Sequence, residues 1–387
     1  MIEKVFNCKM IKYFLISFFY VYSAFADDSK NSVASTVDEF VKPLMIQQQI
    51  PGLALGLIIK GKTYVFNYGI LSKESKSPVT DETLFEIGSI SKTFSATLAT
   101  LAQEKKIINL NDTVDKYLLN LKNSEVGKIP LANLATHVSG GFPLQVPENI
   151  KNNSQLMSYF KNWNPTYSID SHRTYANPSI GLLGLVLAKS MNSKFSKLVD
   201  KEILKKLKMN DTFFEIPSQN FIHYAQGYSR DNTPARLSPG ILAEESYGMK
   251  TSIKDMIKFV EANLNTQPID NNLQKAINKT HETYYKVGAM TQLLVWEQYN
   301  YPMKLEDLLF GNSAEVSMKA NKVVKISPPI QSKENVIINK TGSTNGFGAY
   351  IAFIPYLKSG IVILANKNYP NEERVKFSYE ILTRLLK

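Results

Sequence analysis

Strand-forming segments lie near both ends of this 387-residue chain, and helix-forming segments fill its middle. Near the start, the apolar run 52–59 and the β-prone run 63–66 surround a short turn that contains glycine, which predicts a β-hairpin. Near the end, the runs 347–355 and 360–365 are rich in strand formers, and segment 371–387 has apolar residues at near-helical spacing. We therefore expect both ends of the chain to meet in one antiparallel β-sheet flanked by helices.

The middle of the chain has a different pattern, because alanine, leucine and other helix formers are frequent there. Helices are expected at 94–103, 180–190 and 198–207. The predicted fold class is therefore α/β (α+β). An α/β domain would comprise residues 27–80 and 215–387, with an all-helical domain, residues 81–214, inserted into it. A boundary between domains is a favoured place for a ligand, so the active site is expected in the cleft between the two.

The first 26 residues have the pattern of a signal peptide. Three lysines precede an apolar run at 13–22, and small residues follow it at 23–26. The run is shorter than the roughly 20 residues that a membrane span needs, so we expect cleavage after Ala26, a periplasmic protein and no membrane anchor. The single cysteine, Cys8, would leave with the signal peptide. The mature chain would then have no disulfide and no thiol chemistry.

The formal net charge of +11 raises the question of nucleic-acid binding. The basic residues are dispersed, however, without an arginine-rich run or interleaved aromatic residues, so no nucleic-acid partner is expected. The four histidines lack the paired spacing of metal ligands, and they are His137, His172, His223 and His281. We therefore expect no metal ion and no cofactor. A monomer is the default expectation.

A serine and a lysine three residues apart, Ser89 and Lys92, stand just before the first helical segment. In a helical turn the lysine lies on the same face as the serine, where a desolvated amine can take the hydroxyl proton. Free N–H groups at a helix start can also stabilise a developing oxyanion. The pattern alone is weak, because Ser158 and Lys161 have the same spacing, and an N-cap serine beside a solvated lysine would look the same.

A second candidate motif is Tyr175-Ala176-Asn177, in a loop-like stretch that Pro178 ends. A tyrosine near cations can lose its proton well below its usual pKa of about 10 and then act as a base and an acid. Asn177 offers an amide donor and acceptor to a substrate amide. Tyr369-Pro370-Asn371 has the same spacing, so this motif is also weak by itself.

The third candidate, Lys340-Thr341-Gly342, occurs once and follows the β-prone run 335–339, so it should lie on a strand that lines the cleft. The lysine supplies a cation and the threonine a donor, and the glycine would let a substrate approach the backbone closely. The glycines that follow, up to Gly348, do not match a phosphate-binding loop, since they lead into a strand and lack its lysine.

Together, in this order and spacing, the three motifs resemble those of the serine penicillin-recognising enzymes, for which S-x-x-K, S-D-N and K-T-G are typical. Tyr-Ala-Asn in the second place resembles class C β-lactamases. The resemblance extends from about residue 35 to the C-terminus. Similar stretches are 140–147, 238–240, 247–248, 296–297, 353–355 and 364–371.

The resemblance implies a serine hydrolase that opens β-lactam rings through an acyl-enzyme on Ser89. The N–H groups of Ser89 and Ser343 would form the oxyanion hole, and Lys92 and Tyr175 would share the proton transfers. Either Tyr175 or the substrate amine would activate the water that releases the acyl group.

For the substrate, the resemblance implies two sets of contacts. Lys340, which also supports Tyr175, would face the carboxylate together with Thr341 and Asn371. Gln145 and Asn177 would hold the amide of the acyl side chain. Tyr247 would line the pocket.

Three segments depart from the class C pattern. Leu-Asp-Ala-Glu-Ala-Tyr-Gly becomes 242–248, Leu-Ala-Glu-Glu-Ser-Tyr-Gly, and Gly-Leu-Gly-Trp-Glu becomes 293–297, Leu-Leu-Val-Trp-Glu. Thr-Tyr-Thr-Ala-Gly-Gly becomes 136–141, Thr-His-Val-Ser-Gly-Gly. A D-alanyl-D-alanine peptidase or an esterase of the same fold is the nearest alternative, although esterases commonly lose Lys-Thr-Gly. A catalytically dead β-lactam sensor or binding module is a third possible function.

Overall fold

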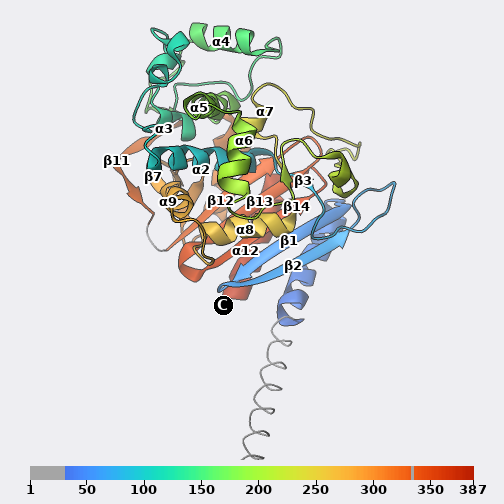
Figure 1. Ribbon diagram of the computed structural model, residues 1–387. Coiled ribbons are helices and arrows are strands. Elements are labelled where there is room, and N and C mark those ends of the chain that lie inside the picture. Colours follow the sequence, from blue (N-terminus) through green and yellow to red (C-terminus); the bar gives the residue numbers. More distant parts are fainter. Residues whose placement is uncertain (1–30, 333–334) are drawn as a thin grey trace, which may run out of the picture.

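The centre of the computed structural model, which describes residues 31–332 and 335–387, is a nine-stranded antiparallel sheet (Figure 1). From one edge to the other, the strands are β11 (Val324–Gln331), β7 (Glu282–Val287), β8 (Met290–Gln292), β9 (Glu297–Asn300), β12 (Val336–Ser343), β13 (Gly348–Ile354), β14 (Ser359–Ala365), β1 (Gly52–Ile59) and β2 (Lys62–Gly69). The predicted signal peptide, with Cys8, lies outside the described residues.

The two ends of the chain meet in this sheet, as predicted. Strand β1 pairs with β14 from Leu53 opposite Ala365 to Ile58 opposite Gly360. The predicted hairpin of β1 and β2 is also present. Its turn residues, Lys60 and Gly61, have φ angles of 50° and 81°, the left-handed geometry that suits two-residue hairpin turns.

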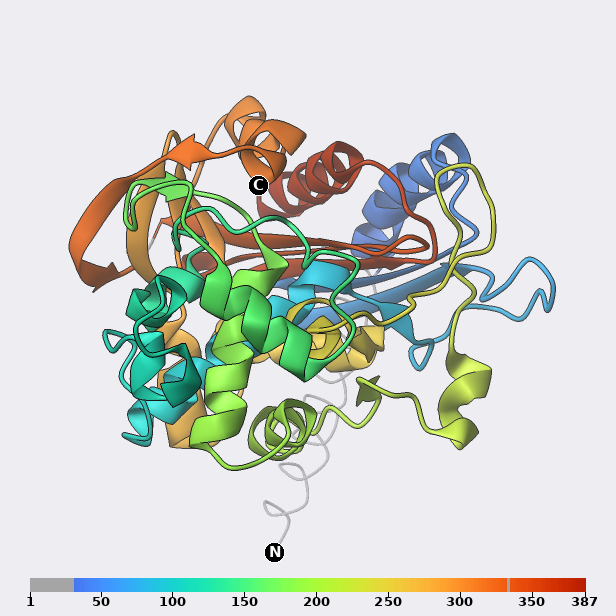
Figure 2. The ribbon, with the colours of Figure 1, turned by 90° about the horizontal axis from the view of Figure 1, so that it is seen from above.

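Helices cover both faces of the sheet (Figure 2). One face carries α12 (Asn371–Leu386), as predicted, and a helix over residues 31–47. We did not predict the latter, although its buried residues Val37, Val41 and Leu44 recur at helical spacing. The opposite face carries α2 (Ser91–Glu104), α8 (Ile253–Asn263) and α9 (Asn271–Lys279). Helices α10 (Leu305–Gly311) and α11 (Ala314–Met318) follow β9. No helix among the described residues has the length and apolar character of a bilayer span.

Residues 81–214 are mostly helical and contain α2, α3 (Leu131–Ala135), α4 (Asn153–Asn162), α5 (Asn177–Ser190) and α6 (Phe195–Val199). The helices expected at 94–103 and 180–190 lie within α2 and α5. The one expected at 198–207 is shorter, and a π-helical turn, Asp200–Leu204, takes its place after α6.

This segment also contains three two-residue strands, which the prediction did not include. Strands β3 (Phe85–Glu86) and β5 (Thr212–Phe213) both pair with β6 (Lys250–Thr251). Strand β4 (His172–Arg173) pairs with β10 (Asn321–Lys322). Two-residue strands leave no periodic pattern in a sequence, so nothing indicated them.

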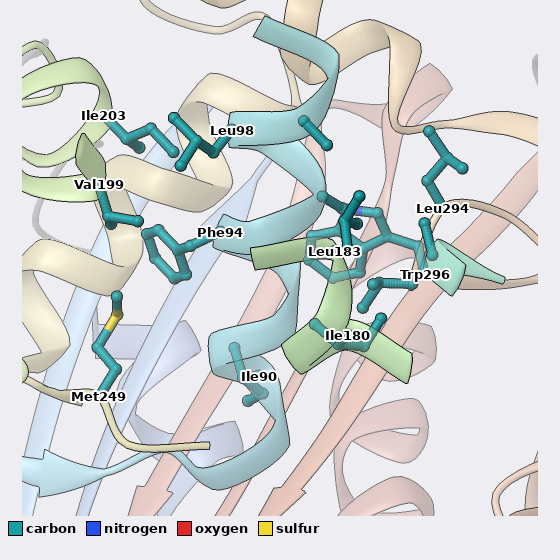
Figure 3. Close-up of a cluster of buried hydrophobic side chains, with 14 of the residues drawn as sticks. Ile90, Phe94, Leu98, Ile180, Leu183, Val199, Ile203, Met249, Leu294 and Trp296 are labelled. Carbon is teal, nitrogen blue, oxygen red and sulfur yellow. The ribbon is translucent and has the colours of Figure 1, made fainter. Parts of the chain in front are cut away.

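A continuous hydrophobic core joins these helices to the sheet (Figure 3). Phe94 of α2 stacks on Phe259 of α8 with ring centroids 4.2 Å apart, and Trp296 packs edge-on against Phe353 of β13 at 5.2 Å. Burying each such side chain contributes about 1.5–3 kcal/mol. Through this core, the start of α2 is held firmly against β12.

Candidate active site

Ser89 lies in a 3₁₀ turn, Gly88–Ile90, that leads directly into α2. Lys92 is one turn further on, and its amine donates to the Ser89 hydroxyl at 2.9 Å and to the Ser246 carbonyl oxygen at 2.8 Å. Its side chain is fully buried. Burial lowers the pKa of Lys92 to about 8, and the nearby cation of Lys340 also lowers it. Tyr175 has the opposite effect and raises the pKa of Lys92. A lysine in this state can accept a proton from the serine near neutral pH.

Strand β12 approaches the serine turn so closely that two positions must be glycine. A Cβ on Gly88, which has a φ of +51°, would lie 2.4 Å from the Ser343 carbonyl oxygen, and one on Gly342 would lie 2.0 Å from that of Ile87. We expected Gly342 to make room for a substrate. The structure gives it a further requirement, since it lets the strand that carries Ser343 reach the turn that carries Ser89.

Gly88→Ala is expected to slow turnover roughly 100-fold, because a displacement near 1 Å at reacting groups costs about that much. The overpacked contact should also lower the free energy of unfolding by roughly 1–3 kcal/mol. Gly61→Ala is the matched control, since Gly61 also has a positive φ but no atom within 4 Å of the added Cβ. Steady-state kinetics and urea unfolding of both variants check this. Equal activity in the two variants would contradict it.

Successive residues of β12 serve opposite sides of the strand. Gly342 faces the serine turn, whereas Ser343 faces α12, where its hydroxyl accepts from the Arg374 guanidinium at 2.8 Å. The same guanidinium donates to the Gly342 carbonyl oxygen at 2.7 Å. Asn371, the first residue of α12, lies beside Ser343 with a hydroxyl–amide oxygen distance of 3.5 Å. Arg374, which is fully buried behind the strand, was not predicted from the sequence.

Tyr175 lies between two amines. The Nζ atoms of Lys92 and Lys340 are each 5.1 Å from the centre of its ring. Burial by itself would raise the pKa of Tyr175, but the cations of Lys340 and Lys92 outweigh it and lower the pKa to about 8. The proximity of Ser89 and Lys92 also lowers the pKa of Tyr175. The buried Tyr175 hydroxyl nevertheless makes no hydrogen bond of normal geometry with the described residues. The phenol is thus free to exchange a proton with a bound molecule.

These groups open into a pocket of about 190 Å³. The predicted site residues that line it are Ser89, Tyr175, Lys340, Thr341, Gly342, Ser343 and Asn371. The other lining residues are Leu144, Arg173, Glu297, Gly311, Asn312, Ser317 and Met318. Lys92 lies beneath Ser89. A larger hollow of about 810 Å³ at the β7–β11 edge of the sheet contains none of the predicted residues.

Besides Lys92, three predicted residues do not line this pocket. Gln145 is exposed, next to Leu144. Asn177 is buried, its N–H donates to the Leu144 carbonyl oxygen at 2.9 Å, and its side-chain oxygen has no partner among the described residues. Tyr247 is half-buried after the short helix α7 (Ala243–Ser246). Pro178, expected to end a loop, instead lies in the first turn of α5, which begins at Asn177.

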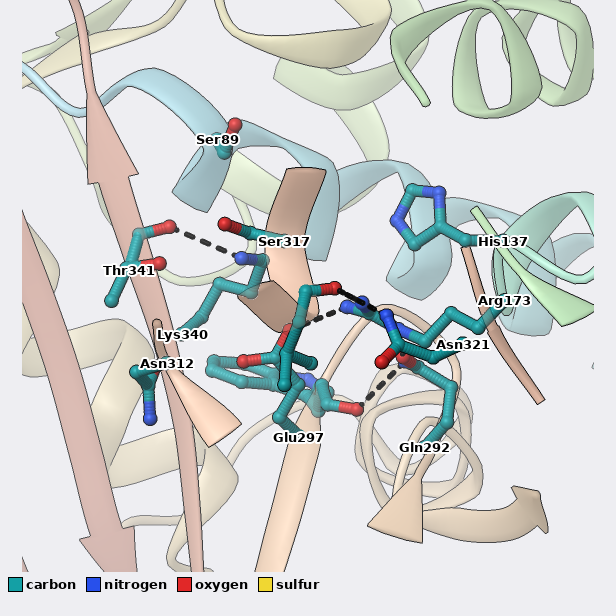
Figure 4. Close-up of polar contacts among 12 residues, drawn as sticks. Ser89, His137, Arg173, Gln292, Glu297, Asn312, Ser317, Asn321, Lys340 and Thr341 are labelled. Carbon is teal, nitrogen blue, oxygen red and sulfur yellow. Dashed lines mark hydrogen bonds and ion pairs between the residues drawn. The ribbon is translucent and has the colours of Figure 1, made fainter. Parts of the chain in front are cut away.

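A buried ion pair forms one wall of the pocket (Figure 4). The Arg173 guanidinium contacts the Glu297 carboxylate at 2.8 Å, donates to the Gln292 side-chain oxygen at 2.6 Å and donates to the Val316 carbonyl oxygen at 2.9 Å. This pair was not predicted, because its members are 124 residues apart in the sequence. Within residues 31–332 and 335–387, no group of three or more acidic, histidine or cysteine side chains could hold a metal ion.

Comparison with known proteins gives consistent matches. A family model described as "Beta-lactamase" matches residues 37–383. A "Beta-lactamase" of Pseudomonas fluorescens is 46% identical over 91% of this chain and 99% of its own, and that of Escherichia coli (strain K12) is 39% identical over 90% and 93%.

Solved structures agree with this. A class C beta-lactamase in complex with cefoxitin is 42% identical, with a TM-score of 0.89 over 92% of this chain and 99% of its own. A "Beta-Lactamase/D-Alanine Carboxypeptidase" from Pseudomonas syringae is 48% identical, with a TM-score of 0.89 over 91% and 99%.

Proposed function

Because this chain belongs to the class C branch of the beta-lactamase family, we propose that it hydrolyses β-lactam antibiotics through an acyl-enzyme on Ser89. One observation carries the proposal: the Ser89 hydroxyl accepts a hydrogen bond from a fully buried lysine and opens into the same pocket as Tyr175 and Lys340. A serine is a weak nucleophile until a positioned base takes its proton, and here two candidate bases are present.

In the proposed acylation step, the Ser89 oxygen attacks the carbonyl carbon of the lactam ring. Its proton passes to Tyr175, directly or by way of Lys92, and the ring C–N bond breaks as Tyr175 gives that proton to the nitrogen. The N–H groups of Ser89 and Ser343 stabilise the negative oxygen, which the glycine-dependent approach of β12 to the serine turn supports. Water, activated by Tyr175 or by the freed substrate amine, then releases the acyl group.

Substrate binding is proposed to use two regions of the site. Lys340, Thr341 and Asn371 line the pocket on one side and would bind the carboxylate. Gln145, Asn177 and Tyr247 would contact the acyl side chain from beyond Leu144. In support of this, Asn177 lies next to the pocket, since its N–H donates to the carbonyl oxygen of Leu144, which lines it.

The test is hydrolysis of a chromogenic cephalosporin by the purified mature chain, with the burst and the steady state both recorded. Continued turnover is expected. A single burst equal to the enzyme present, with no turnover after it, would mean an enzyme that acylates but does not deacylate, such as a penicillin-binding peptidase.

A D-alanine carboxypeptidase is the second candidate function. It is favoured by the Pseudomonas syringae structure, whose title names both activities, and by a Burkholderia cenocepacia "D-alanine Carboxypeptidase AmpC" that is 42% identical with a TM-score of 0.88. Release of D-alanine from a peptide ending in D-alanyl-D-alanine tests it. The ratio of kcat/KM for that peptide and for a cephalosporin would rank the two activities.

The pH dependence of the reaction follows from Lys92 and Tyr175, whose pKa values are both lowered to about 8. Each becomes a proton acceptor when it loses its proton, so kcat/KM is expected to rise as the pH is raised through about 8. The two groups titrate as a coupled pair, so the rise of kcat/KM near pH 8 reports the deprotonation of both together. A profile measured from pH 6 to 9.5 checks this, and a rate that falls over that range would contradict it.

We also propose that the chain is exported to the periplasm, with cleavage after Ala26, and that it works as a monomer without a membrane anchor. The α/β residues, 27–80 and 215–387, and the mainly helical residues, 81–214, would form the two walls of the substrate cleft. Intact-mass measurement of the secreted protein tests the cleavage site, and sedimentation tests the monomer.

A further inference from the structure

His137 bonds to the backbone on both sides of Tyr175 and contacts the Tyr175 ring. Its carbonyl oxygen accepts from the N–H of Thr174 at 2.9 Å, and its Nδ1 atom accepts from the N–H of Ala176 at 3.3 Å. Its ring lies 4.4 Å from the Tyr175 ring, centroid to centroid. One residue thus accepts hydrogen bonds from the N–H groups of both neighbours of the tyrosine and also packs against its phenol.

The local conformation of His137 makes this arrangement possible. Its φ is +60°, in the left-handed region, which most residues other than glycine avoid but in which histidine, like asparagine and aspartate, is enriched. This conformation turns the ring back toward residues 174–176. The residue belongs to the segment Thr-His-Val-Ser-Gly-Gly, where the class C pattern has Thr-Tyr-Thr-Ala-Gly-Gly. In Figure 4 the imidazole lies on the helical side of the site, above Arg173 in this view.

The imidazole must be neutral to accept the Ala176 N–H, because both nitrogens of a protonated ring are donors. Burial, followed by the cations of Arg173, Lys92 and Lys340, holds the pKa of His137 well below its ordinary value. Nδ1 is therefore the acceptor, and the proton is on Nε2, which is buried without a partner among the described residues. A third positive charge beside Lys92 and Lys340 is thereby avoided.

We propose that His137 is a positioning residue that fixes the Tyr175 ring between the amines of Lys92 and Lys340. The inference rests on the proposed role of Tyr175 in proton transfer. His137 does not touch the pocket, so it acts through the tyrosine. If its contacts are lost, the phenol can move relative to the two amines, and its proton transfers slow while substrate binding by other residues is retained.

Two substitutions separate the contacts of His137. His137→Asn keeps an acceptor oxygen near the position of Nδ1 and suits a positive φ, whereas His137→Phe keeps a ring and removes the acceptor. We expect His137→Asn to retain kcat within about threefold. For His137→Phe we expect a loss of kcat of about tenfold or more, with KM little changed. The limb of the pH profile near 8 should also move upward in His137→Phe, because the amines stabilise the phenolate less well.

His281→Phe is the matched control. His281 is also buried, and its Nε2 atom bonds to Asn263 at 2.9 Å, in the core away from the pocket. This variant should lose stability but keep the wild-type pH profile. If His137→Phe loses no more kcat than His281→Phe and has an unshifted profile, the residue is merely structural and the inference is overturned.

Tyr175→Phe distinguishes failure of this inference from failure of the proposed function. It should be slow, and His137→Phe should add little in that background, since the two residues act together. Additive losses would show that His137 acts independently of the tyrosine and would overturn the inference alone. A Tyr175→Phe variant with the wild-type rate would refute the proposed role of Tyr175 and remove the basis of the inference with it.

Discussion

Ser89→Ala is expected to abolish both turnover and covalent labelling by penicillin. The hydroxyl that Lys92 contacts at 2.9 Å is the proposed site of the acyl bond, and nothing replaces it in the variant. Loss of the single nucleophile of a serine hydrolase costs on the order of 10⁶ in kcat. Intact-mass spectrometry after incubation with penicillin measures the adduct, and a chromogenic cephalosporin measures the residual rate.

Ser158→Ala is the matched control for this prediction. Ser158 and Lys161 have the same spacing as Ser89 and Lys92, but they lie in α4, where the Ser158 hydroxyl accepts a hydrogen bond from the exposed Asn162 side chain at 3.4 Å. This variant should keep full activity and full labelling. A stoichiometric serine adduct in Ser89→Ala would show that the nucleophile is misassigned.

Glu297→Ala is expected to lower the free energy of unfolding by about 3–5 kcal/mol. Both side chains of the Arg173–Glu297 pair are almost fully buried, at 1% and 6% exposed, so removing the carboxylate leaves an uncompensated guanidinium in the core. The bonds to Gln292 and Val316 satisfy part of the guanidinium but supply no negative charge. Urea unfolding followed by fluorescence measures the loss.

An exposed ion pair provides the comparison. Glu125 and Lys128 are in contact at 2.6 Å, but their side chains are 44% and 62% exposed. Glu125→Ala should cost less than about 1 kcal/mol, because solvent screens such pairs. Replacing Arg173 and Glu297 together with methionine should recover much of the stability lost in Glu297→Ala. If Glu297→Ala is as mild as Glu125→Ala, the Arg173 guanidinium does not need the carboxylate of Glu297 to compensate its buried charge, and the prediction fails.

The strands at the two ends of the chain could be predicted because their apolar runs are long and bounded by turn residues. The predicted run 52–59 coincides with β1, and Lys340-Thr341-Gly342 lies on a strand as expected. The order of the three motifs, each weak by itself, predicted that Ser89, Tyr175 and Lys340 lie together. All three line one pocket. Local pattern and family resemblance therefore indicated the centre of the site.

What the sequence did not indicate depends on contacts between distant residues. The pairing of Arg173 with Glu297, and the bonds of Arg374 to β12, have no local signature, because a lone arginine in a sequence usually points to solvent. The requirement for glycine at position 342 was only partly predicted, because it too depends on a contact between distant residues. Only the approach of the serine turn shows that a Cβ there would collide with Ile87. The helix over residues 31–47 was missed although Val37, Val41 and Leu44 recur there at helical spacing.

The pairing of β1 with β14 has a consequence for how the protein is made. The N–H of Gly52 donates to the side-chain oxygen of Asn366, 314 residues later in the chain, and β1 lies between β14 and β2. During synthesis, β1 therefore cannot pair with β14 until almost the whole chain has emerged from the ribosome. Such non-local pairing makes folding slow and leaves apolar strands exposed in the nascent chain. Late completion of the sheet would suit the proposed export to the periplasm, because a chain that has not yet folded can be threaded through a translocation pore.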